Sequence, residues 1–173
     1  MKDTVAHIAD GIDRATAAIG RAAAWCCLYL VLAEFAVVVM RYLLAIGSIR
    51  LQESVLYAHA ALVMLAAAWT LRIDGHVRVD VFYGQAAPRT RALIDLFGTV
   101  VFLFPVVIAV GLLSVPYVAR SWAILEGSRE TSGLPFVYLL KTLIPLFAVL
   151  LGFQGIAQAI RAALVLAEPR RHE

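Results

Sequence analysis

The chain has 173 residues, of which 62% are apolar and only 16% are charged. Soluble domains carry about 25% charged residues, because they need polar surface to face water. This composition excludes a soluble enzyme, and the abundance of apolar residues excludes a disordered chain. The two cysteines, Cys26 and Cys27, are adjacent in an apolar run, so they fit neither a disulfide framework nor a metal site. We expect an integral membrane protein of one domain.

Four apolar stretches have about the 20 residues that a helix needs to cross the hydrocarbon core of a bilayer. They are continuous and lack the alternation of barrel strands, which favours helices. We therefore predict an all-α integral membrane protein with four transmembrane helices, covering residues 22–44, 54–71, 93–118 and 136–160. Pro105 and Pro145 lie inside these spans, where we expect them to cause modest kinks.

Residues 1–20 precede the first span and have their own pattern. Val5, Ile8, Ile12 and Ile19 recur at roughly helical spacing, whereas the charged residues of this segment avoid that face. One interpretation is an amphipathic N-terminal helix that lies at the membrane interface. The other is a helical extension of the first span.

The distribution of Lys and Arg predicts the orientation. Four spans place both termini on one side, and that side carries ten Lys and Arg residues against four on the other. Because cytoplasmic loops carry the excess of Lys and Arg, both termini, including the tail 161–173, are predicted to be cytoplasmic. The predicted location is the bacterial or archaeal inner membrane.

Charged residues within the spans need a partner or a function, because a charge is costly in hydrocarbon. Glu34 lies in the first span, Arg41 follows seven residues later on nearly the same helix face, and Lys141 lies in the fourth span. A structural pair of Glu34 with Lys141 or Arg41 is one interpretation. The other is a carboxylate that couples transport to a proton or a substrate.

Polar and small residues of the fourth span indicate helix packing. Gln154 and Gln158 share a face, and Gly155, Ala159 and Ala163 form a stripe of small residues. Packing by amide hydrogen bonds is the ordinary use of such residues, and a permeation path is the alternative. A haem site would need paired histidines in the spans, and His59 is the only histidine there. The chain also lacks nucleophile, nucleotide and metal-ligand motifs, so we expect no enzyme activity and no cofactor.

The loop after the second span, Leu71–Tyr83, contains the most specific pattern. Three valines alternate there with Arg78 and Asp80, and Gly75 is expected to permit a turn before this short amphipathic segment. With its surroundings, the loop resembles the small membrane subunit of tripartite ATP-independent periplasmic (TRAP) transporters, of the DctQ type. That family has at this place an Arg, then a Gly and a His, then Val or Ile residues ahead of an Asp. The residues that resemble it are Arg72, Gly75, His76, Val77, Val79 and Asp80, spaced here as R-x-x-G-H-V-x-V-D.

Further matches follow in the order and spacing of the family. The first span ends Val39-Met40-Arg41-Tyr42, Pro88-Arg89 lead into the third span, and Ser121-Trp122 and Glu130–Pro135 resemble the outer loop. Gln52-Glu53-Ser54 open the second span, where the family usually has a Trp and paired acids; this chain keeps Glu53 alone. The resemblance covers about residues 20 to 165.

The resemblance implies a small permease subunit, a scaffold that braces a large elevator-type membrane subunit. Sodium-coupled uptake of an organic anion, typically a carboxylate, would start from a periplasmic substrate-binding protein. The implied partners are these two proteins and membrane lipid, with no nucleic acid. We name as candidates for subunit packing Glu34, Arg41, Lys141, Gln154, Gly155 and Gln158, and as candidates for docking of the binding protein Arg50, Glu53, Arg120, Glu126, Arg129 and Glu130. The cytoplasmic-loop motif comprises Arg72, Gly75, His76, Arg78 and Asp80.

Two other classes compete with this interpretation. An autonomous homodimeric exporter of small molecules would use Glu34 and would transport a cationic dye without another subunit. A small redox subunit or membrane enzyme would hold a cofactor, for which the sequence offers no ligand pattern. The transported substrate, the coupling stoichiometry and the association of complexes do not follow from the sequence.

Overall fold

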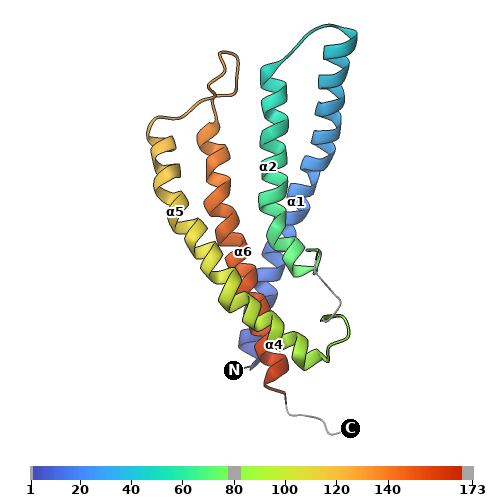
Figure 1. Cartoon of the computed structure of the whole chain (residues 1–173), viewed down its shortest axis with the longest axis vertical. Helices are drawn as coiled ribbons and strands as arrows, with labels where there is room; N and C mark the ends of the chain where they lie inside the picture. The colour runs from blue at the N-terminus through green and yellow to red at the C-terminus, as the bar shows by residue number, and fades with distance from the viewer. Residues whose placement is uncertain (1, 78–82, 169–173) are drawn as a thin grey trace.

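The computed structural model describes residues 2–77 and 83–168, which are almost entirely helical (Figure 1). The chain forms two helical hairpins whose open loops lie at one end of the bundle, here called the loop end. Both termini lie at the opposite end, here called the termini end (Figure 1). The elements are α1 (Lys2–Leu43), α2 (Ile49–Arg72), α4 (Pro88–Gly98), the π-helix η1 (Thr99–Leu103), α5 (Phe104–Ala123) and α6 (Val137–Leu166).

Four continuous helical stretches are long and apolar enough to cross a membrane. They are Thr4–Leu43, Ile49–Arg72, Pro88–Ala123 and Val137–Leu166. This confirms the predicted all-α architecture with four spans. Each stretch is longer than the span expected from hydropathy, because the helices continue into the polar residues at their ends.

Helix α1 contains 42 residues without a break. At 1.5 Å per residue it is about 63 Å long, roughly twice the thickness of the hydrocarbon core. Residues 2–20 therefore continue the first span, as the second of the two interpretations expects. Ile8 is 53% exposed, whereas Ala9, Thr16 and Ala17 are buried. The fully buried positions of this segment are thus small residues, whereas Ile12 and Ile19 are only partly buried.

The third span is built from α4, η1 and α5 in direct succession. In η1 the N–H of Phe104 donates to the carbonyl of Thr99, five residues earlier. Pro105 follows at once, and a proline has no N–H to donate and clashes with the carbonyl four residues before it. A widened turn just before Pro105 accommodates both effects, so the expected modest kink takes the form of a π-bulge.

Helix α6 is the centre of the bundle, and it contacts α1, α2, α4, η1 and α5. In the most apolar 18-residue stretch of this span, 28% of the residues are buried, against 6–11% in the corresponding stretches of the other three spans. The buried apolar residues of the chain are small: nine are alanines, and the only others in the described part are Val107 and Val118. Large apolar side chains point outward, as expected of a bundle that is surrounded by lipid and other helices.

Two glycines permit close contacts between helices. A Cβ atom on Gly20 of α1 would lie 2.5 Å from the Cβ of Trp69 on α2. A Cβ atom on Gly155 of α6 would lie 2.5 Å from Cδ2 of Leu103. The predicted stripe on α6 is used only in part, because Gly155 is buried but Ala163 is exposed. Burial shifts to Ala157 and Ala162, since α6 has neighbours on several sides.

Candidate functional site

Three helices meet at a carboxylate near the termini end. Asp13 of α1 accepts hydrogen bonds from Gln154 Nε2 at 2.9 Å and from Arg161 Nη2, both on α6. Arg72 Nε, at the end of α2, lies 3.3 Å from the same carboxylate. Thr16, one turn further along α1, donates to Gln154 Oε1 at 2.8 Å. We call these five residues the Asp13 junction.

Gln154 is the largest fully buried side chain in the described part of the chain, with 1% exposure. A buried amide must have both its donor and its acceptor satisfied, and here both partners come from α1. The carboxylate of Asp13 is 13% exposed and faces two guanidinium groups. Because the partners lie on three helices, the junction fixes the rotation of α1 about its axis and holds the ends of α2 and α6 together.

A cavity of about 340 Å³ lies beside the junction. Its polar lining comes from Arg72, Arg91, Arg161, Gln154, Gln158, Asp74 and Asp95, and α4 forms one wall. The lining carries three guanidinium groups and two carboxylates, and two of those guanidinium groups, from Arg72 and Arg161, pair with Asp13. Among residues 2–77 and 83–168, no group of His, Cys, Asp and Glu side chains could hold a metal ion.

The predicted loop motif lies next to the cavity, and its residues have different roles. Arg72 belongs to the Asp13 junction. The turn is made by Asp74, with φ 57°, and not by Gly75 as expected. Aspartate tolerates this left-handed conformation because its short polar side chain can bond locally. Gly75 instead donates its N–H to the carbonyl of Thr70 at 2.8 Å. His76 is exposed, and Arg78 and Asp80 lie outside the described residues.

A second carboxylate acts at the loop end. Glu53 of α2 accepts a hydrogen bond from the N–H of Leu134 at 2.6 Å and another from the hydroxyl of Ser128. Both partners lie in the loop between α5 and α6. A Cβ atom on Gly133 would lie 2.8 Å from Glu53 Oε1, so the glycine permits this approach. We call Glu53, Ser128, Gly133 and Leu134 the Glu53 latch.

Lys141 has its partner within the same hairpin. Its ammonium lies 2.5 Å from Glu126 Oε2 and 4.2 Å from the centre of the Tyr117 ring. The ammonium holds the pKa of Glu126 below its ordinary value. In the described part of the chain, Glu34 makes no ion pair with Lys141 or with Arg41. Lys141 is already neutralised by Glu126, and Arg41 lies two helical turns beyond Glu34, about 10 Å along the axis.

The remaining docking candidates lie around the outer loops. Arg50 donates to the carbonyl of Ser132 at 3.3 Å, and Arg120 donates to that of Pro116 at 3.1 Å. Arg129 and Glu130 are exposed. The structure thus divides the six candidates by burial. Glu53 and Glu126 are partly buried by contacts within the chain, whereas the four others are exposed at the loop end.

Sequence reasoning missed three residues of the junction: Asp13, Thr16 and Arg161. The pattern of residues 1–20 places Asp13 among the charged residues that avoid the apolar face, and Arg161 contributes to the predicted orientation alone. A usable signal exists, because Ala9, Asp13, Thr16, Gly20 and Ala23 recur at spacings of three and four residues. A single acid within a face of small residues indicates helix packing around a polar contact.

Comparison with known proteins decides the family. The family model described as "Tripartite ATP-independent periplasmic transporters, DctQ component" matches residues 30–165, most of the chain. The chain belongs to the DctQ family. No curated protein and no solved structure gives a significant match. The match includes Arg72, Gln154 and Arg161 of the junction and the whole Glu53 latch, whereas Asp13 and Thr16 precede it.

Membership in the DctQ family makes this chain a small permease subunit of a TRAP transporter. Four apolar helices agree with a multi-pass membrane protein. The family as a whole consists of transporter subunits and associates with a large membrane subunit and a binding protein.

Proposed function

We propose that this subunit braces the large elevator-type subunit of its transporter, and that the complex takes up an organic anion, such as a carboxylate, together with sodium. A periplasmic binding protein would deliver the substrate. The observation that supports this proposal most strongly is the family match over residues 30–165. The proposal also requires that the transport chemistry reside in the large subunit.

The internal architecture suits a rigid brace. The described core consists of alanines, two valines and a few polar side chains, and the amide of Gln154, its largest buried side chain, is hydrogen-bonded within the chain on both its oxygen and its nitrogen. The Asp13 junction and the Glu53 latch tie the two hairpins together at both ends. A brace has to keep its own helices fixed while parts of the large subunit move across the membrane. Contacts that join the two hairpins at both ends serve this requirement.

We also propose that the protein lies in the inner membrane, with its termini end on the cytoplasmic side. The excess of Lys and Arg that the sequence predicts for this side, ten residues against four, supports that orientation. The loop end would then face the periplasm, where Arg50, Arg120, Arg129 and Glu130 are available to the binding protein. Reversing these charges is expected to weaken docking while leaving the membrane complex intact.

The test is recovery of the tagged chain from native membranes in mild detergent, followed by identification of its partners. We expect a large membrane subunit with roughly 11 or 12 spans, as the family resemblance implies, and sodium-dependent uptake when both subunits and the binding protein are reconstituted in vesicles. Recovery of the chain alone, together with transport of a cationic dye by the chain alone, would support the exporter instead.

A further inference from the structure

Glu34 occupies an unusual place on α1. It lies nine residues before Leu43, the end of the helix, which places it about 13 Å below that end. Its side chain is exposed. On the same face, Val31 is 67% exposed and Val38 is 46% exposed. A carboxylate is thus presented outward from an apolar surface at membrane depth.

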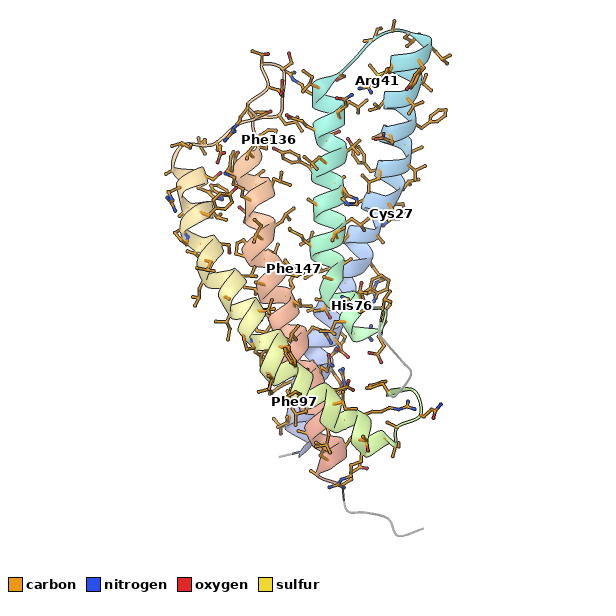
Figure 2. All side chains as sticks on the ribbon, in the orientation of Figure 1. Cys27, Arg41, His76, Phe97, Phe136 and Phe147 are labelled. Carbon is orange, nitrogen blue, oxygen red and sulfur yellow. The ribbon has the colours of Figure 1, made fainter. Side chains whose placement is uncertain are left out.

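This face forms a continuous stripe along α1, composed of Cys27, Val31, Glu34, Val38 and Arg41, all of them exposed. We call it the Glu34 stripe. Figure 2 labels Cys27 and Arg41, which mark its two ends on α1. Because the positions are three or four residues apart, they lie above one another on one side of the helix. The side that faces α2 carries the small or partly buried residues instead.

Glu34 has no partner within residues 2–77 and 83–168: no hydrogen bond or ion pair reaches its carboxylate. The basic groups nearest in depth are unavailable, since Lys141 is bound to Glu126 and Arg41 lies two turns away. Acidic residues in spans nearly always face a bundle interior or pair with another group, because a charge in hydrocarbon is costly. To stay ionised on such a surface, the exposed Glu34 carboxylate needs a basic partner from outside its own bundle.

We propose that the Glu34 stripe is the surface that docks on a membrane helix of the large subunit, and that this helix places a Lys or Arg side chain against Glu34. The inference rests on the proposed function. Charge complementarity defines the partner helix. It must carry a basic side chain at the depth of Glu34, and near the loop end it must carry a neutral or acidic side chain opposite Arg41.

The same argument disfavours two other occupants. A symmetric contact between two copies through this face would bring two Glu34 carboxylates toward each other, because an isologous interface opposes a patch to itself. An acyl chain offers no group that neutralises a carboxylate. By contrast, the apolar groove between α5 and α6, lined by Val107, Gly111 and Gly152 among others, has no polar group that selects one occupant.

The test uses the complex of this chain with its large subunit, purified from membranes. Replacing Glu34 by Lys should reduce the large subunit that is recovered by roughly tenfold or more, because opposed like charges at a desolvated contact are costly. Glu34→Gln should give an intermediate loss. The matched control is Leu32→Gln, which adds an amide at the same depth on a different exposed face of α1 and should leave recovery unchanged.

A second measurement separates docking from folding. Glu34→Leu should leave the thermal midpoint of the isolated subunit unchanged or higher, because leucine suits an outward apolar surface, and it should still lose the large subunit. Charge exchange completes the test. Each basic residue in the spans of the large subunit is replaced in turn by Glu, and one of these replacements should restore binding to the Glu34→Lys variant. Protection of Cys27 from a lipid-soluble maleimide should accompany binding in each case.

Three results would overturn the inference. Equal recovery of the large subunit by the unaltered chain and by the Glu34→Lys variant would exclude the contact. Disulfide cross-linking of two copies through Cys27 in the native complex would assign the stripe to a homodimer. A lowered midpoint of isolated Glu34→Leu would give Glu34 a role within the chain. Failure of the unaltered chain to recover any large subunit would instead contradict the proposed function.

Discussion

At the termini end, the carboxylate of Asp13 binds side chains from two other helices, whereas at the loop end the carboxylate of Glu53 binds a single loop. Asp13 thereby fixes how three helices are rotated and spaced. Glu53 fixes the shape of residues 128–134, and the neighbouring charged side chains, such as Arg129 and Glu130, stay exposed. The same chemical group serves packing at one end and presentation of a surface at the other, because its partners differ.

The largest expected effect comes from Asp13→Ala, which breaks the side-chain contacts with α2 and α6 at once. It leaves Arg72 and Arg161 without their shared carboxylate, and it removes one partner of the buried Gln154. We expect a loss of about 2 kcal/mol in the free energy of unfolding, since water reaches both arginines in part and screens them. Unfolding of the purified subunit in mixed micelles, followed by circular dichroism, measures it.

Asp10→Ala is the control for this prediction. Asp10 lies on α1, less than one turn before Asp13. Its carboxylate is 4.0 Å from the guanidinium of Arg161, but its side chain is 66% exposed. An exposed pair at this distance contributes little. Equal destabilisation by the two variants would show that the junction acts only through general charge.

Gly20→Ala tests whether the termini end also depends on close backbone approach. The added methyl group would lie 2.5 Å from Cβ and 2.7 Å from Cγ of Trp69, which cannot move without shifting α2. We expect a loss of about 1 kcal/mol in the free energy of unfolding, at the low end for overpacked contacts, because a small shift of α2 relieves part of the overlap. Gly11→Ala on the same helix meets nothing within 4 Å, and it should be neutral or stabilising because alanine favours helix. A neutral Gly20→Ala would mean that α1 and α2 can separate freely.

Glu53→Ala should act on the loop end alone. Losing the acceptors for Leu134 and Ser128 should free the loop between α5 and α6 while the helices stay in place. Limited proteolysis should therefore cleave within residues 126–135 several times faster than in the unaltered chain, with little change in the unfolding midpoint. Glu130→Ala is the control, because its exposed side chain lies in the same loop outside the latch. A drop in the midpoint as large as that of Asp13→Ala would remove the difference between the two ends.

The sequence predicted the four spans because hydropathy depends on composition alone and needs no knowledge of contacts. It could not predict which polar residues meet, because Asp13 and Gln154 are 141 positions apart. Lys141 shows the same limit: depth suggested a pair with Glu34, but the nearer Glu126, 15 residues before it, binds it instead. Glu53 was selected by family resemblance, yet its contacts with Leu134 and Ser128 depend on how the hairpins lean together. Local chemistry was readable from the sequence, and helix rotation was not.

The smallest expected effect concerns the contact between Lys141 and Glu126, which lies at the loop end within one hairpin. Because the neighbouring ammonium holds the pKa of Glu126 below the 4.5 of an unperturbed glutamate, the contact is fully present above pH 4.5 and is lost as the pH falls through the lower value. The indole N–H of Trp122 donates to Thr142 at 2.8 Å, next to Lys141, so its NMR signal reports on this region. We expect it to stay constant from pH 7.5 to 5 and to shift only below that range. Glu126→Gln should show the shifted signal at every pH, and a signal that moved between pH 7.5 and 5 in the unaltered chain would show that the carboxylate is not held by Lys141.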